Sequence, residues 1–141
     1  MKKLINTSFA YAIAAMVAGV FFREFTKFNG FTGKTSLSIL HVHLFVLGML
    51  FLLAVVLLDK HFKISKNNKF NFFFYVYNAG MIVSCLMFLG RGILQTLEIT
   101  PSAAINASIS GFSGIGHIMI SVGIITFFLM LKSQITSIEE I

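Results

Sequence analysis

Four long stretches without a charged residue constrain this chain more than any other feature. A helix needs about 20 apolar residues to cross a bilayer, and each stretch is of that length. Helices are the expected form, because every backbone polar group must find a partner inside lipid. The sequence therefore predicts an all-α membrane protein, a single domain over residues 1–141 with four transmembrane helices in an up-down-up-down bundle. The predicted helices cover residues 4–24, 37–58, 70–97 and 105–131.

The first stretch also has features of a secretory signal peptide. Lys2 and Lys3 precede it, and Ala12 and Ala14 have the small side chains of a cleavage site. The apolar stretch nevertheless continues well past these alanines to Phe22, and no soluble domain follows for export. We therefore expect an uncleaved first helix.

The charges of the chain fall mostly between the apolar stretches. The net charge is +6, and hydrophobic residues make up 57% of the sequence against 11% for charged residues. Basic residues in short loops indicate topology and contact with anionic lipid headgroups, so nucleic acid is not an expected partner. The single Cys85 lies inside an apolar stretch, where a small buried side chain is expected.

Basic residues are unequally divided between the two ends of the predicted bundle. Short loops place the N-terminus, the middle loop and the C-terminus at one end. This end has the larger group, which is Lys2, Lys3, Lys60, Lys63, Lys66, Lys69 and Lys132. The other end has Arg23, Lys27, Lys34 and Arg91. The positive-inside rule therefore predicts that both termini are cytoplasmic.

Apart from Arg23 and Glu24 at the end of the first predicted helix, three histidines and one arginine lie within the predicted membrane helices. His41 and His43 are near the start of the second helix, Arg91 is near the end of the third, and His117 is in the fourth. A rise of about 1.5 Å per residue puts the first two on the order of 6 to 9 Å deep and His117 roughly 12 Å from the same face. Ionisable side chains at such depths are costly in lipid and mark functional sites by default. We expect these four residues to lie at a similar level in the outer half of the bundle.

The spacing of His41 and His43 excludes a site in which both bind the same metal ion. Successive residues of a helix are about 100° apart, so His41 and His43 point to nearly opposite faces and cannot chelate one ion. Each histidine then needs its own partner. One alternative is a buried ring that hydrogen-bonds to a neighbouring helix. His61 follows Asp59 at a helix end and needs no such explanation.

Glycines surround these polar residues. They are Gly48, Gly90, Gly92, Gly111, Gly114 and Gly116. Small residues let transmembrane helices pack closely. They also leave room for a flat macrocycle that lies against a helix. Their spacing alone does not choose between close packing and a cofactor site.

Imidazoles on separate membrane helices suit the axial ligation of haem iron. A haem spans a gap between helices that two imidazoles alone would not bridge. Arg91, at the outer interface, is then placed to pair with a haem propionate. Its alternative is snorkelling to the interface, with Glu98 as its partner. The leading hypothesis is a cofactor site for haem b formed by His41, His43, His117 and Arg91, with the histidines as candidate metal ligands.

Residues 41–49, with the sequence HVHLFVLGM, resemble the His-x-His helix of the haem–copper oxidase catalytic subunit. In that family the two histidines ligate two different haems from opposite faces. The resemblance implies that His43 and His117 are the axial pair of a low-spin haem and that His41 faces a second site. It covers this one stretch only, and the chain lacks the further membrane histidines of a copper site. Oxygen reduction with proton pumping is therefore not implied.

The chain as a whole resembles a family of small, uncharacterised four-helix membrane proteins of bacteria. This resemblance implies a multi-pass protein of the bacterial inner membrane. We expect a haem-binding protein that is similar to a b-type cytochrome or that senses haem, and the sequence does not assign it an enzymatic reaction. Beside the lipid bilayer, its candidate partners are a redox protein, a membrane complex or a second copy of the chain.

Two other functions fit the same residues. In the first, the histidines and Arg91 line a polar pocket that binds or transports a small anion or a metal ion such as zinc or copper, with Glu98 as the nearest acid. In the second, the chain is an accessory subunit whose polar residues only join helices to one another or to a larger complex. Absorbance spectra, metal analysis and His-to-Gln variants separate these alternatives from haem binding.

Overall fold

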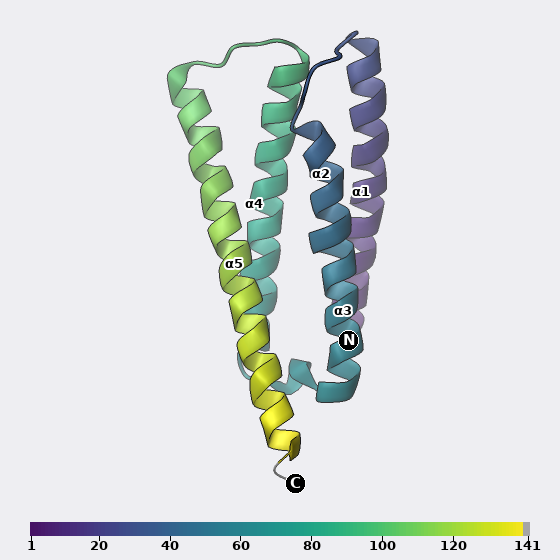
Figure 1. The fold of residues 1–141 in the computed structure, drawn as a ribbon, viewed down its shortest axis with the longest axis vertical. Coiled ribbons are helices and arrows are strands. Elements are labelled where there is room, and N and C mark those ends of the chain that lie inside the picture. Colours follow the sequence, from purple (N-terminus) through teal and green to yellow (C-terminus); the bar gives the residue numbers. More distant parts are fainter. Residues whose placement is uncertain (140–141) are drawn as a thin grey trace.

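Four long helical rods make up the part of the chain that the structure describes. The computed structural model describes residues 1–139 (Figure 1). Its elements are α1 (Lys2–Phe28), α2 (Leu37–His43), the π-helix η1 (Leu44–Leu50), α3 (Phe51–Phe62), the short 3-10 turn η2 (Ile64–Lys66), α4 (Phe70–Thr96) and α5 (Ala103–Glu139). Because α2, η1 and α3 follow one another without a break, they form one rod. There is no strand within residues 1–139.

All four rods are long and apolar enough to cross a membrane. They alternate in direction along the chain, so that α1 begins and α5 ends at the same end of the bundle (Figure 1). The predicted all-α, up-down-up-down bundle of four transmembrane helices is therefore confirmed.

The helices extend beyond the apolar stretches, most of all α5, which continues past Lys132 to Glu139. The first helix, α1, continues past Arg23 and Glu24, whose side chains form an ion pair at 3.7 Å. It stops before Gly30, whose φ of 60° suits a residue just beyond a helix end. The helix α3 ends before Lys63, which also has a left-handed conformation. Long charged side chains are tolerated at such ends because they reach water from the interface.

The rods pack as two hairpins. In the first hairpin α1 lies along α2, η1 and α3, and in the second α4 lies along α5. The hairpins meet mainly where α2 contacts α4. The backbones of α4 and α5 approach closely: a Cβ added to Gly80 would lie 2.7 Å from the carbonyl oxygen of Gly116. Glycines thus make this helix–helix contact possible.

Aromatic rings fill the half of the bundle that contains the N-terminus. Phe73 and Tyr77 are fully buried there, and Phe51 packs against the ring of Phe127 with 5.4 Å between centroids. In the opposite half, α5 leans away from α4 (Figure 1), and residues 103–108 are exposed. The bundle is therefore closely packed in one half and more open in the other, which is the half that holds the membrane histidines.

Substituting Gly80 with alanine should destabilise the protein. The new Cβ would meet backbone atoms of α5 at 2.7 to 2.8 Å, and these atoms can move only if the helices separate. Overpacking of this kind costs about 1–3 kcal/mol. The Tm in detergent, followed by circular dichroism, should therefore fall. Gly111→Ala is the matched control, because nothing lies within 4 Å of its added Cβ, and an equal loss of Tm in both variants would contradict this account.

Candidate functional site

A π-helical segment directly follows His43. This segment, η1, has seven residues, and its hydrogen bonds run to carbonyls five residues back instead of four. The change of register is supported from outside, because the Tyr77 hydroxyl donates to the Leu47 carbonyl at 2.8 Å and the Ser8 hydroxyl donates to the Met49 carbonyl at 2.9 Å. Side chains of α4 and α1 thus stabilise carbonyls within η1. Such segments are rare and are frequent at functional sites.

The π-segment also fixes the rotation of α2 relative to α3. An extra residue in a helical turn rotates everything before it by up to about 100° compared with a continuous α-helix. Gly48 allows this arrangement, since a Cβ there would lie 2.6 Å from Cγ of Tyr11. The orientation of His41 and His43 toward the neighbouring helices therefore depends on η1, Gly48 and the hydroxyl groups that bind it.

His43 and His117 face each other across the two hairpins. Their ring centroids are 6.1 Å apart, and the ring planes are nearly perpendicular at 81°. Phe88 of α4 packs against both, with centroid distances of 4.8 Å to His43 and 5.7 Å to His117. The structure therefore brings together one histidine from α2 and one from α5, with an aromatic ring from α4 beside them.

Each of these two imidazoles is anchored by its Nδ1 atom. Nδ1 of His43 lies 3.1 Å from the carbonyl oxygen of Ile39, and Nδ1 of His117 lies 2.7 Å from that of Ser113. A carbonyl oxygen only accepts, so both Nδ1 atoms must carry the hydrogen in the neutral ring. The lone pair is then on Nε2, which is the atom left to bind a metal ion.

His41 lies at a different interface, between α2 and α1. Its ring stacks on that of Phe22, with 6.0 Å between centroids and 14° between planes, and it is close to Gly19. Its Nδ1 atom is buried and has no hydrogen-bond partner. The structure therefore separates His41 from the His43–His117 pair, in keeping with the opposite faces expected from helical spacing.

Arg91 bridges α4 and α5 near the histidine pair. Its guanidinium donates to the Ser110 hydroxyl at 2.8 Å, and it forms no ion pair with Glu98. Of the alternatives for Arg91, the pairing with Glu98 is thus not found. A single neutral hydroxyl is a weak partner for a guanidinium, which has five donors, so most of its capacity is free for a carboxylate.

The glycines near the site divide into two groups. A Cβ on Gly48, Gly92 or Gly116 would meet neighbouring atoms at less than 3 Å, so these three serve close packing. A Cβ on Gly90, Gly111 or Gly114 would meet no atom within 4 Å. Close packing therefore accounts for the first group only, and the second group lies in open space on α4 and α5.

The acidic and sulfur ligands of a conventional metal site are missing from this region. No group of three or more His, Cys, Asp or Glu side chains able to hold a metal ion occurs within the part of the chain that the structure describes. A structural zinc site takes four protein ligands, and a catalytic one takes three. The pair His43 and His117 can supply only two positions.

The family model described as protein of unknown function, DUF2871, matches residues 1–134 of the chain. The chain belongs to this DUF2871 family. The expectation of an uncharacterised family over the whole chain agrees with this match. Neither a curated protein nor a solved structure matches the chain, so the comparisons give no support to the resemblance of residues 41–49 to the haem–copper oxidase helix.

Several residues near the histidine pair could not be identified from the sequence as the histidines could. Phe88 is one of many phenylalanines, and the apolar run from Leu44 to Leu50 has no pattern that marks a π-helix. Ser8 and Tyr77 do carry a weak signal in the sequence of this DUF2871 protein. Each has a hydroxyl group inside a membrane helix, where that group needs a hydrogen-bond partner.

Removing the Tyr77 hydroxyl should loosen η1. Tyr77→Phe keeps the buried ring but leaves the Leu47 carbonyl without its donor, so we expect a loss of about 1 kcal/mol in stability. The ¹⁵N imidazole resonances of His43 should shift as α2 reorients. Tyr75→Phe is the matched control, because Tyr75 is exposed and its hydroxyl has no comparable bond. Unchanged resonances in Tyr77→Phe would contradict the role of η1.

Proposed function

We propose that this DUF2871 protein binds haem b within the membrane, with His43 and His117 as the two axial ligands. The observation that carries the proposal is the facing pair of imidazoles with 6.1 Å between centroids and Nδ1 anchored on both sides. Two imidazoles bound by Nε2 to opposite sides of one metal ion, at about 2.0–2.1 Å each, have centroids about 6 Å apart. The observed separation fits that arrangement.

The number of protein ligands favours haem over a bare metal ion. Two imidazoles complete the coordination of an iron that already has four nitrogen ligands from a macrocycle. With no third or fourth side chain nearby, a zinc or copper ion would be poorly held. When bound, the haem would supply one-electron redox chemistry, and the chain would hold it and tune its potential.

The position of the histidines also speaks against a purely structural role. Both Nδ1 atoms bond to carbonyls of their own helix, so neither bond joins two helices. His117 is exposed and His43 is half-buried. An exposed imidazole at this depth is costly in hydrocarbon unless another group covers it. A cofactor between α2 and α5 would provide that cover.

Arg91 and the open glycines supply the remaining features of such a site. The guanidinium would exchange its bond to the Ser110 hydroxyl for a haem propionate, with which it forms two charge-assisted hydrogen bonds. The absence of side chains at Gly90, Gly111 and Gly114 leaves space along α4 and α5 for the macrocycle edge. His41 belongs to the α1 side of α2 and would not ligate the same iron.

The proposal includes a location. The larger group of lysines lies at the end that contains the N-terminus, which by the positive-inside rule is the cytoplasmic end of a bacterial inner-membrane protein. The haem would then lie in the outer half of the bilayer. A b-type cytochrome that exchanges electrons with a redox partner or a membrane complex, or a haem sensor, would use this arrangement.

Absorbance spectra of single histidine variants test the ligand assignment. The purified wild-type protein, supplied with haem, should show a Soret band and the spectrum of a low-spin iron with two histidine ligands. His43→Ala and His117→Ala should each lose the low-spin signal, because one axial bond is removed. His41→Ala should keep it. A wild-type protein without a Soret band would overturn the proposal, and loss of the signal in His41→Ala alone would overturn the pairing.

Replacing Arg91 with lysine tests the propionate contact. Lysine keeps the positive charge but cannot hold a carboxylate through two parallel hydrogen bonds. Arg91→Lys should therefore release haem about tenfold faster, as expected for the loss of one strong charged hydrogen bond, and shift the midpoint potential. Arg23→Lys is the control, since Arg23 is paired with Glu24 at an exposed position. Equal haem retention and potential in Arg91→Lys, Arg91→Gln and wild type would leave snorkelling as the role of Arg91.

A further inference from the structure

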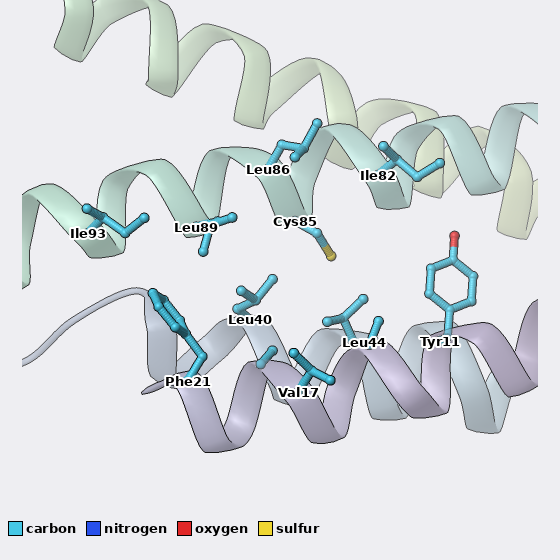
Figure 2. Close-up of a pocket in the computed structure, with 12 residues that line it drawn as sticks. Tyr11, Val17, Phe21, Leu40, Leu44, Ile82, Cys85, Leu86, Leu89 and Ile93 are labelled. Carbon is cyan, nitrogen blue, oxygen red and sulfur yellow. The ribbon is translucent and has the colours of Figure 1, made fainter. Parts of the chain in front are cut away.

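A long apolar groove lies between α1 and α4. Neither His43 nor His117 lines it. Its main part has a volume of about 560 Å³ and is lined from both sides by aliphatic and aromatic side chains, with α2 forming its floor (Figure 2). A second part of about 400 Å³ shares Tyr11, Ala14 and Ile82 with the first and reaches Thr7 and Phe74. The groove therefore runs along most of the length of α1 within the membrane.

The walls of the groove offer almost no polar group to a ligand. The hydroxyl of Tyr11 points across to α4 (Figure 2), where it donates to Oδ1 of Asn78 at 2.8 Å. This buried bond joins the two walls and satisfies the hydroxyl donor. The remaining surface of the main part is hydrocarbon and the thiol of Cys85. An occupant of the main part must therefore be apolar and slender enough to lie between two helices.

One end of the groove carries a positive charge. Five residues of α1 line the groove at helical spacing, which are Thr7, Ala10, Ala14, Val17 and Phe21. Lys3 lies one turn before Thr7 and extends this stripe beyond the lining residues. Lys3 is the terminal member, and its Nζ lies 4.1 Å from the ring centroids of both Phe74 and Tyr75. It forms no ion pair with a described acid. A cation is thus held at the mouth of the groove, where the membrane meets water.

We propose that the groove binds an acyl chain of an anionic glycerophospholipid, with the phosphate beside Lys3 and the hydrocarbon between α1 and α4. The apolar walls match the chain, and the ammonium at the mouth matches the charge of the headgroup at interface level. The small side chains of Ala10 and Ala14 leave the space that the chain fills.

The charge distribution favours a lipid over a second copy of the protein in this groove. The end of the bundle at which Lys3 lies also carries Lys2, Lys63, Lys66 and Lys69, and described acids there are few. A second copy inserted in parallel would bring an equal set of lysines to the same level. An anionic lipid neutralises this charge, whereas a second copy doubles it.

Native mass spectrometry of the full-length protein can test the proposal. The protein is reconstituted in vesicles of equal parts phosphatidylglycerol and phosphatidylcholine and then released in mild detergent. We expect phosphatidylglycerol to remain bound in preference to phosphatidylcholine. Ala14→Phe fills the groove and should abolish most of the retained lipid. Ala54→Phe, the same change at an exposed position of α3 outside the groove, should retain lipid as wild type does.

Lysine variants test the headgroup separately from the hydrocarbon part of the groove. Lys3→Gln should reduce the preference for phosphatidylglycerol about fivefold, the effect expected for one interfacial lysine. Lys2→Gln is the control, since Lys2 is exposed and outside the groove stripe.

Equal lipid retention in Ala14→Phe and wild type, or an unchanged preference in Lys3→Gln, would overturn the proposal. A wild-type dimer that becomes a monomer in Ala14→Phe without loss of lipid would show that a second copy fills the groove. The lipid measurements and the oligomeric state do not depend on whether the protein binds haem.

Discussion

Carbonyl groups inside the bilayer need hydrogen-bond partners, and the shape of the second rod, formed by α2, η1 and α3, depends on which partners they have. A regular helix satisfies them internally. The seven-residue segment η1 gives up the regular register, and hydroxyl groups of Ser8 and Tyr77 reach its carbonyls from α1 and α4. These two bonds do more than stabilise a segment. They connect three rods at the level directly below His43, so the orientation of the histidine is tied to the packing of the bundle.

The glycines show how one residue type serves two opposite purposes in a small membrane protein. Gly80, Gly116 and Gly123 bring α4 and α5 into backbone contact, and that contact lies in the closely packed half. Gly111 and Gly114 continue along the same helix α5, but there the rods diverge and the missing side chains leave space. His117 therefore lies between a closely packed stretch of α5 and a stretch with open space beside it.

The main features of the fold follow from the sequence because they depend on single segments. The length of each apolar run predicts a spanning helix, and the rise per residue places His43 and His117 at similar depth, where the structure brings their rings together. The partners of η1 do not follow in this way. They are 30 and 41 residues away from the carbonyls they bind, and an apolar run contains no periodic pattern that would reveal a shift of register. The contact of Arg91 with Ser110 likewise depends on how far α5 leans, which no local pattern encodes.

The facing histidines come from different hairpins, and this has a consequence for biosynthesis. His43 belongs to the second rod to leave the ribosome and His117 to the last, whereas the contacts of α1 with α2, η1 and α3 form within the first half of the chain. The first hairpin can therefore assemble while its imidazole at position 43 still faces lipid. Only the arrival of α5 completes the pair, so the two rings cannot meet until the fourth rod has been translated.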